Sequence, residues 1–313
     1  MTNKQDAVPL KEYIFLLILA ALWGGSFTFI KVALEAFPPM TIVMIRMFFG
    51  GAILLIIALA RCDKFPTTSR NWAELLIQGS LQGALPFFLI TWGEQYLDSS
   101  TAGVINSTPP MFVFIITVFI LQSAKFDPQK FVGILFGISG VALIASSQGH
   151  AVSSNNSLAV LAVFGASFSY ASGAIFGRRF SDQSVFVTAS TSLMLASLLI
   201  SPIVLIFEPL SNLTFQLEPS LALLALTLLS TALASLIYFR LIKTLGSLAT
   251  TSNAYLRALF SIVFGVIFLS ESFNSSLIIA TILIFFGVFM VTGQFRNLVT
   301  NKIITQKEYD KNG

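Results

Sequence analysis

The chain of 313 residues is strongly apolar, with 55% hydrophobic residues, 10% charged residues and a mean hydropathy of +0.85. A soluble domain typically carries about 25% charged residues, so this composition excludes a water-soluble fold. The formal net charge of +4 does not point to nucleic acid, because the Lys and Arg residues are spread over short connections between apolar segments.

Ten apolar segments are long enough to cross a bilayer, which requires about 20 residues per helix. The first follows Lys4 and Lys11, but it is longer than a signal-peptide core and no cleavage site follows it, so we expect it to be retained. The sequence therefore predicts an all-α membrane protein with ten transmembrane helices. The spans are predicted at residues 12–34, 38–60, 72–93, 98–121, 129–147, 158–178, 184–206, 219–243, 248–270 and 275–295.

The basic residues fall on one side of this topology. Lys and Arg lie in or next to the connections after the second, fourth, sixth and eighth spans, as at Arg61 and Arg178, and at both ends of the chain. The other connections hold no Lys or Arg and carry acids such as Glu94 and Glu271. The positive-inside rule then places both termini in the cytoplasm, with residues 296–313 as a cytoplasmic tail.

The second half of the chain repeats the first. The hexapeptide WGGSFT at residues 23–28 recurs as FGASFS at residues 164–169. Each half contains five spans, and because five is an odd number the second copy is inverted in the bilayer. Two inverted repeats are characteristic of secondary transporters, whose substrate site lies near the midplane between them. We assign residues 12–147 to the first five-helix repeat and residues 158–295 to the second, inverted one.

Small residues and prolines interrupt the spans. Gly24 and Gly25 in the first span allow another helix to approach closely, which is a packing role. Pro86 in the third span and Pro109-Pro110 in the middle of the fourth remove backbone N–H groups. In lipid the freed carbonyls need partners from protein or water, so we expect helix breaks that face a cavity or form packed kinks.

Polar side chains recur at membrane depth on several spans. Each is explained by hydrogen bonds between helices, worth about 0.6–2 kcal/mol. Their convergence also fits a central substrate cavity, and both interpretations stay open. The candidates are Trp23 and Ser26 in the first span, Gln82 in the third, Asn106 in the fourth, Ser167 and Tyr170 in the sixth, Tyr238 in the eighth, and Asn253, the repeat counterpart of Asn106, with Tyr255 in the ninth.

Two arginines lie within predicted spans. Arg257 is about ten residues into the ninth span, near the midplane, where an arginine costs about 2.5–3.5 kcal/mol even on a lenient insertion scale. Such a residue marks a functional site by default, so we expect Arg257 to bind substrate or to brace the broken helices. Arg46 is about eight residues into the second span, roughly 12 Å deep at 1.5 Å per residue, and a structural role is favoured.

Acidic residues are absent from the interiors of the predicted spans. Arg257 therefore has no evident counterion, and we expect an electropositive site suited to a substrate carboxylate or phosphate. For the same reason we expect no proton relay through an intramembrane carboxylate. The single Cys62 cannot form an internal disulfide and the single His150 falls in a polar loop, so we expect no metal and no cofactor.

These residues resemble the drug/metabolite transporter superfamily, and within it the EamA family of bacterial ten-helix permeases. The resemblance covers both halves, about residues 12–147 and 158–295. Its motifs are LWGGSF at residues 22–27, IRMF at 45–48, STA at 100–102 leading to Pro109, FLSES at 268–272 with a structural Glu271 closing the ninth span, and FGV at 286–288.

Two positions depart from the family pattern. Ala124-Lys125 replaces the acid expected at the end of the fourth span, and Leu256-Arg257 replaces the proline expected in the ninth. The second departure puts Arg257 where the first copy has Pro110. The resemblance implies a multi-pass permease of the bacterial inner membrane that works by alternating access, with a central cavity lined by both repeats. Family members export amino acids and related metabolites or import small metabolites.

The function we expect is secondary transport, as a permease or exporter of a small anionic or zwitterionic metabolite such as an amino acid. The alternative is a polytopic membrane protein without transport function, such as an enzyme or receptor. We do not expect an enzyme, because the sequence contains no recognisable His/Cys/Glu cluster, paired intramembrane carboxylates or phosphate-binding glycine loop. The expected partners are a small-molecule substrate and the lipid bilayer, without nucleic acid, and the chain is expected to act as a monomer or homodimer.

Overall fold

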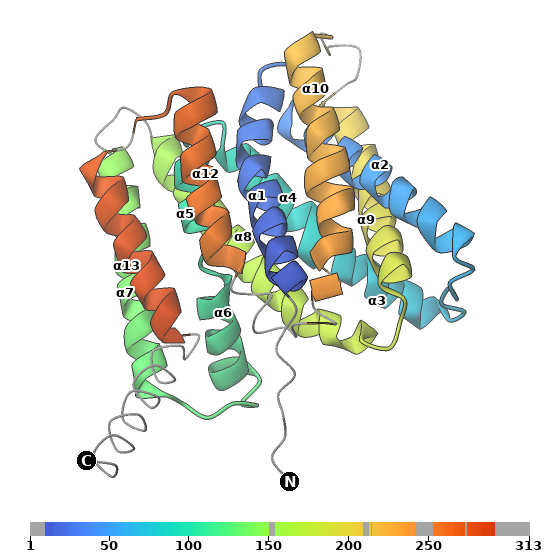
Figure 1. The fold of residues 1–313 in the computed structure, drawn as a ribbon, viewed down its shortest axis with the longest axis horizontal. Helices are drawn as coiled ribbons and strands as arrows, with labels where there is room; N and C mark the ends of the chain where they lie inside the picture. The colour runs from blue at the N-terminus through green and yellow to red at the C-terminus, as the bar shows by residue number, and fades with distance from the viewer. Residues whose placement is uncertain are drawn as a thin grey trace.

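The computed structural model is helical in all of its regular structure (Figure 1). It describes residues 10–149, 154–208, 213, 215–238, 240–241, 244, 253–272 and 274–291. The all-α prediction is confirmed for this part of the chain. His150 and the predicted tail, residues 296–313, lie outside the described residues, as does the start of the predicted ninth span.

The helices of the two halves follow the predicted spans in order. In the first half they are α1 (Leu10–Ala33), α2 (Pro39–Ala60), α3 (Ser69–Gly79), η1 (Ser80–Ala84), α4 (Leu85–Gly93), α5 (Ser99–Ile105), α6 (Pro109–Ile115), η2 (Ile116–Ile120) and α7 (Pro128–Gly149). In the second half they are α8 (Ser154–Phe176), η3 (Gly177–Phe180), α9 (Val185–Phe207), α10 (Leu217–Ala225), η5 (Leu226–Leu233), α12 (Asn253–Leu269) and α13 (Ser275–Val291).

Seven helical stretches of the described chain are long and apolar enough to cross a membrane. The third, fourth and eighth of the predicted spans are each built from more than one helical segment, with the π-helical turns η1, η2 and η5 inside them. Three further apolar helices are shorter over their described residues. These are Pro128–Ile144, Leu256–Leu269 and Ser275–Val291.

Prolines and left-handed residues mark several helix ends. Pro39, Pro109 and Pro128 are the first residues of α2, α6 and α7, where the missing proline N–H costs no helical hydrogen bond. Cys62 after α2 and Ser270 after α12 both have φ of 54°, the left-handed conformation that closes many helices. The chain therefore leaves these helices abruptly, into the short connections predicted from the sequence.

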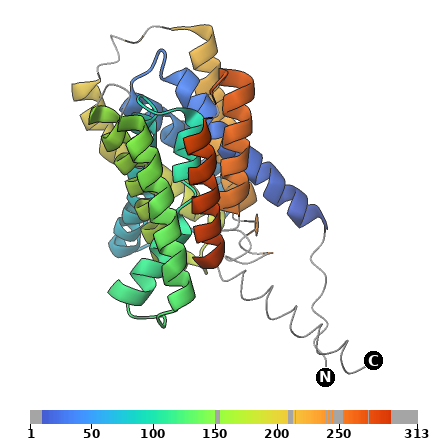
Figure 2. The same ribbon diagram turned by 90° about the vertical axis from the view of Figure 1, so that its left-hand side faces the viewer.

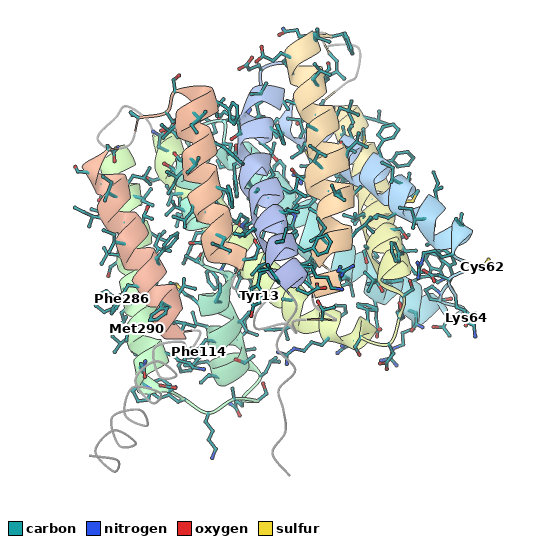
Figure 3. All side chains as sticks on the ribbon, viewed as in Figure 1. Tyr13, Cys62, Lys64, Phe114, Phe286 and Met290 are labelled. Carbon is teal, nitrogen blue, oxygen red and sulfur yellow. The ribbon has the colours of Figure 1, made fainter. Side chains whose placement is uncertain are left out.

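Equivalent helices of the two halves pack antiparallel. Along α7 and α13, a Cβ on Gly133 would lie 2.6 Å from the carbonyl oxygen of Gly287, and one on Gly140 would lie 2.9 Å from that of Ala280. Figure 2 shows these two helices side by side. Figure 3 places Phe286 and Met290 along α13. Glycine on both partners is what allows backbones to approach this closely.

The pairing of α2 with α9 is also antiparallel and is closed at both ends by a carboxylate. At one end Glu208 accepts hydrogen bonds from the backbone N–H groups of Met40 (3.2 Å) and Thr41 (2.7 Å) at the start of α2. At the other end Ser184, the residue before α9, donates its hydroxyl to Asp63 at 2.5 Å. Each acid lies just beyond the end of one helix and binds the beginning of the other; Glu208 caps backbone N–H groups of α2, and Asp63 binds the hydroxyl of the residue before α9.

The pairing of α5 with α12 repeats this device at one end. Glu271, which follows α12, accepts hydrogen bonds from the backbone N–H groups of Ser99 (2.6 Å) and Ser100 (3.0 Å) in the first turn of α5. Ser261 packs on Gly103 farther along the same contact. The counterpart of Glu271 in the first half is Ala124, so the sequence supplies no carboxylate for the opposite end.

Gly24 and its repeat counterpart Gly165 lie in different surroundings. A Cβ on Gly24 would lie 2.5 Å from Cβ of Phe260 and 2.8 Å from the carbonyl oxygen of Arg257, so α1 and α12 are in backbone contact here. A Cβ on Gly165 would meet only Leu89, at 3.8 Å, which is an ordinary contact. The close helix approach expected from the glycine pair thus lies beside Arg257 in one half only.

We predict that Gly24→Ala lowers the thermal stability of the purified protein, because overpacking a tight contact costs about 1–3 kcal/mol. Gly165→Ala is the matched control and should leave stability unchanged or slightly higher, since alanine favours helix over glycine by up to about 1 kcal/mol. Thermal unfolding of both variants in detergent measures the difference. Equal losses in the two variants would contradict the packing difference between the copies.

Candidate functional site

A double proline divides the predicted fourth span into α5 and α6. In a continuous α-helix the carbonyls of Ile105 and Asn106 would accept hydrogen bonds from the N–H groups of residues 109 and 110. Both of these are prolines and have no N–H. Two backbone carbonyls are therefore released in the middle of an apolar span, where each needs another donor.

Groups next to the break and side chains from other helices supply those donors. The Ile105 carbonyl accepts hydrogen bonds from the backbone N–H (3.3 Å) and the hydroxyl (2.9 Å) of Thr108, and from the hydroxyl of Ser167 on α8 (3.5 Å). The Asn106 carbonyl accepts from Nη2 of Arg257 on α12, and the same nitrogen donates to Oδ1 of Asn106 at 2.7 Å. Arg257 is the repeat counterpart of Pro110, so the second copy satisfies the carbonyl that the proline of the first copy leaves open.

The break before Pro86 is satisfied in the same way. Within η1 the hydrogen bond spans five residues, as in the bond from the Leu85 N–H to the Ser80 carbonyl. The next such bond would need an N–H from Pro86, so the carbonyl of Leu81 is left open. It accepts the hydroxyl of Ser169 on α8 at 2.8 Å. Helix α8 thus provides one serine to each of two proline breaks.

Arg257 lies beside an aromatic pair. Its guanidinium carbon lies 6.0 Å from the centre of the Trp23 ring, and Trp23 in turn packs on Tyr238 with ring centres 5.2 Å apart. Tyr170 interacts electrostatically with both Arg257 and Arg46. Arg257, Trp23, Tyr238 and Tyr170 are half-buried, although they come from helices in the middle of the bundle. The structure therefore connects Arg257 with three further predicted site residues, Trp23 and Tyr170 directly and Tyr238 through Trp23.

Several polar atoms near this arrangement are buried without a partner among the described residues. Two are donors, Nε of Arg257 and Nδ2 of Asn106. Two are acceptors, Oδ1 of Asn253 and Oε1 of Gln82, the latter 3.0 Å from where a Cβ on Gly173 would lie. Asn253 is one helical turn from Arg257 on α12. Buried donors and acceptors are rarely left unpaired in proteins, so these atoms have the chemistry of a polar ligand site.

Other predicted site residues are engaged elsewhere. Asn253 donates Nδ2 to the carbonyl of Leu16 on α1 at 3.4 Å. Its Oδ1 and Nδ2 of Asn106, its repeat counterpart, both have no partner among the described residues. Ser26 donates to the carbonyl of Trp23 in its own helix at 2.7 Å. Tyr255 belongs to α12, but its side chain lies outside the described residues.

Arg46 is buried among residues of other helices. It is 3% exposed, its Nε donates to the hydroxyl of Thr231 in η5 at 3.2 Å, and its guanidinium carbon lies 3.9 Å above the Phe87 ring. Arginine stacks well on aromatic faces, which lowers the cost of burying the charge. Arg46 therefore links α2, α4 and η5.

An apolar pocket is present away from this arrangement, between α2 and α9. It contains none of the predicted site residues, and several of its side chains are exposed on the outside of the bundle, where lipid would contact them. It is therefore not the candidate site. Its lining residues are Met44, Ile45, Phe48, Phe49, Ser197, Leu198, Ser201 and Leu205.

Sequence reasoning missed the environment of one acid. Glu94 was assigned to the connection that follows the third predicted span, and the structure shows that the residue is 0% exposed. Lys31 of α1 lies against the same turn and donates to the carbonyls of Glu94 (2.7 Å) and Leu97 (2.8 Å). The only sequence signal was the position of a lysine near the end of the first span and an acid at the end of the third.

Comparisons with known proteins agree with this architecture. The model of the EamA-like transporter family matches the chain twice, over residues 10–146 and 157–293. The chain belongs to the EamA-like transporter family. The resemblance expected from its motifs is thereby confirmed, and this family places the protein among transporter-like membrane proteins.

Relatives of this EamA-like protein span nearly its whole length. It is 23% identical to the uncharacterized transporter YoaV of Bacillus subtilis over 91% of this chain and 98% of YoaV. It is 27% identical to the uncharacterized inner membrane transporter YedA of Escherichia coli K12 over 92% of each chain. A protein of known crystal structure aligns with a TM-score of 0.62 and 19% identity, covering 90% of this chain and 97% of that one, which supports the fold.

We predict that Arg257→Ala is more destabilising than Ser167→Ala in the absence of ligand. Arg257 is the donor to the Asn106 carbonyl, and an unsatisfied buried acceptor costs about 1–3 kcal/mol. Ser167 shares the Ile105 carbonyl with Thr108, so its loss should cost less than about 1 kcal/mol. Melting temperatures of the two variants in the same detergent test the order; a larger loss for Ser167→Ala would show that the proline breaks are held in another way.

Proposed function

We propose that this protein is a secondary transporter that moves a small anionic or zwitterionic metabolite, such as an amino acid, across the bacterial inner membrane. Family membership establishes only a transporter-like membrane protein. The observation that supports the substrate class is the pair of buried donors without partners, Nε of Arg257 and Nδ2 of Asn106. A carboxylate carries acceptors only, so it complements two donors of this kind.

A zwitterion fits the remaining unpaired atoms. Oδ1 of Asn253 and Oε1 of Gln82 are acceptors, and they suit the ammonium of an amino acid whose carboxylate is bound by Arg257. Trp23 and Tyr238 offer ring faces on which part of a substrate or its ammonium could pack. We accordingly keep Trp23, Gln82, Asn106, Tyr170, Tyr238, Asn253 and Arg257 as the proposed substrate-binding residues.

The proposed topology has ten spans in two inverted repeats, residues 12–147 and 158–295, with both termini in the cytoplasm. Its support is the antiparallel pairing of α2 with α9, α5 with α12 and α7 with α13, because equivalent helices of inverted copies run in opposite directions. The distribution of Lys and Arg supports the orientation.

Alternating access is the mechanism we propose for this arrangement. On one side of the double proline α5 packs against α12, whereas on the other side α6 packs against α8. Ser107 and Thr108 lie between the two segments, outside both helices. A break of this kind gives α6 freedom to move while α5 keeps its contact with α12, and such discontinuous helices recur at the substrate sites of transporters.

The experiment that tests the substrate class is a thermal-shift screen of amino acids and small carboxylates against wild type and Arg257→Lys. Lysine keeps the charge and one donor for the Asn106 carbonyl but loses the planar fork that could hold both that carbonyl and a ligand. We predict ligands that raise the wild-type melting temperature and bind Arg257→Lys roughly tenfold or more weakly, as for a lost hydrogen bond to a charged group.

Arg70→Lys is the matched control, because Arg70 is exposed and, among the described residues, forms an ion pair with Glu74 alone. It should respond to the same ligands as wild type. Equal shifts for wild type and Arg257→Lys would remove Arg257 from the binding site. Counterflow of the stabilising compounds in proteoliposomes then tests transport itself, and a protein that binds without exchanging label would count against a transporter.

A further inference from the structure

Glu94 is a fully buried acid that no described residue pairs with. Both carboxyl oxygens are buried and accept no hydrogen bond, and none of the ion pairs among the described residues involves Glu94. Leaving a buried polar group without a partner is costly, and for an ionised carboxylate the cost is far higher than for the neutral acid. The packing around Glu94 therefore suits the protonated form.

The charged neighbours of Glu94 do not neutralise it. The Lys31 ammonium is within range of Glu94 but directs its two hydrogen bonds to backbone carbonyls, those of Glu94 and Leu97. Arg46 acts on Glu94 only electrostatically, while its own contacts are with other residues. Glu271 acts in the opposite sense, because its carboxylate caps α5 and adds a second negative charge.

Helices α8 and α5 contribute no cationic side chain near Glu94. Helix α8 contacts Gly93 through Val163 and Ala159, and between residues 154 and 176 it contains no Asp, Glu, Lys, Arg or His. Helix α5 contains none either, and Asp98 just before it is a further acid. Burial is accordingly the main reason that the pKa of the Glu94 carboxyl lies well above its ordinary value; Lys31 and Arg46 oppose that rise and Glu271 adds to it.

Unpartnered hydroxyls lie near Glu94 on the helices that surround it. Thr28, one turn from Lys31 in α1, and Thr91, one turn from Glu94 in α4, are buried, and their hydroxyls have no partner among the described residues. The hydroxyl of Ser99 is a third. Trp23, beside Arg257, lies farther along α1 from Thr28. Buried polar groups thus occur between Glu94 and the proposed substrate site.

We propose that Glu94 is the residue at which this transporter binds a coupling proton. The inference rests on the transport function proposed above. The conformation described here encloses Glu94, so it accepts the neutral carboxyl. Opening this end of the bundle to water would favour the carboxylate, which the Lys31 ammonium could then pair with in place of the two carbonyls. Binding or release of the proton would thereby be linked to closing or opening of the end at which α1, α4 and α12 finish.

A metal ion is a poorer occupant of this position. Within the described part of the chain no group of three or more His, Cys, Asp or Glu side chains is arranged to hold a metal. The Lys31 ammonium beside the same turn also repels a cation. The sequence predicted no proton relay through a carboxylate inside a span. Glu94 lies outside the spans, in the turn that follows α4, and the packing of that turn buries it.

The first test concerns protonation alone and needs no substrate. Because the folded-state pKa of Glu94 is raised, its contribution to stability is complete at acid pH and is lost as the pH rises from the ordinary carboxyl range through the raised pKa. We predict that the melting temperature of wild type falls over this range and that Glu94→Gln, which resembles the neutral acid, loses this fall and is the more stable protein at alkaline pH. Parallel profiles for the two proteins would overturn the proposal.

The second test separates coupling from transport. Proteoliposomes containing the full chain are assayed for counterflow of a labelled amino-acid mixture and for accumulation of the same mixture driven by an imposed pH gradient, with an internal pH dye to follow protons. Glu94→Gln should retain counterflow but lose gradient-driven accumulation and the dye signal. Glu35→Gln is the matched control, since Glu35 is an exposed acid in the connection between α1 and α2, and it should behave as wild type.

Each outcome of this assay decides between the proposals. Wild-type counterflow without any response to the pH gradient, or a response to a sodium gradient instead, would overturn proton binding while leaving the transport function intact. Absence of counterflow in wild type would overturn both. If Glu94→Gln does not fold, net amino-acid uptake by wild type down an imposed amino-acid gradient still tests the coupling. Each cycle of net uptake then carries the coupled proton and changes the internal pH, whereas a transporter without a coupled proton leaves the dye signal unchanged.

Discussion

The central constraint on this fold is that every backbone carbonyl inside a membrane needs a donor. Prolines at positions 86, 109 and 110 remove three N–H groups, and at each of the three carbonyls left open a side chain from another helix donates a hydrogen bond. Ser167 and Ser169 come from α8, and Arg257 comes from α12. The helix breaks are therefore not local defects. They fix where α8 and α12 must pass, and so determine which residues meet in the middle of the bundle.

The two repeats differ most clearly in the residues that donate to the open carbonyls. Ser26 and Thr28 are the counterparts of Ser167 and Ser169, yet Ser26 bonds within its own helix and the Thr28 hydroxyl has no described partner. Arg257 stands opposite Pro110, and its guanidinium makes the hydrogen bond that Pro110 cannot make. The two halves thus differ at this position and complement each other. The first half contains the helix break, and the second half contains the side chain that donates to the open carbonyl.

Much of the helical architecture follows from the sequence, because a span of about 20 apolar residues has few alternatives to a helix in lipid. The break between α5 and α6 was predictable as well, because two consecutive prolines cannot donate backbone hydrogen bonds within a helix. The π-helical turns were not, since segments such as Ser80–Ala84 carry no signal of their own. For Arg257 the sequence left two roles open, because its partner is the backbone of Asn106. The burial of Glu94 could not be predicted, because it depends on how a connecting turn packs against α1 and α8.

The lone cysteine of the chain has a practical consequence. Cys62 is exposed and adjoins Asp63, whose hydrogen bond to Ser184 closes one end of the α2–α9 pairing (Figure 3). A thiol-reactive fluorophore would therefore attach at one defined position of the native protein, without removal of any other cysteine. Its emission would report on whether this joint between the two halves stays closed or separates during a reaction cycle.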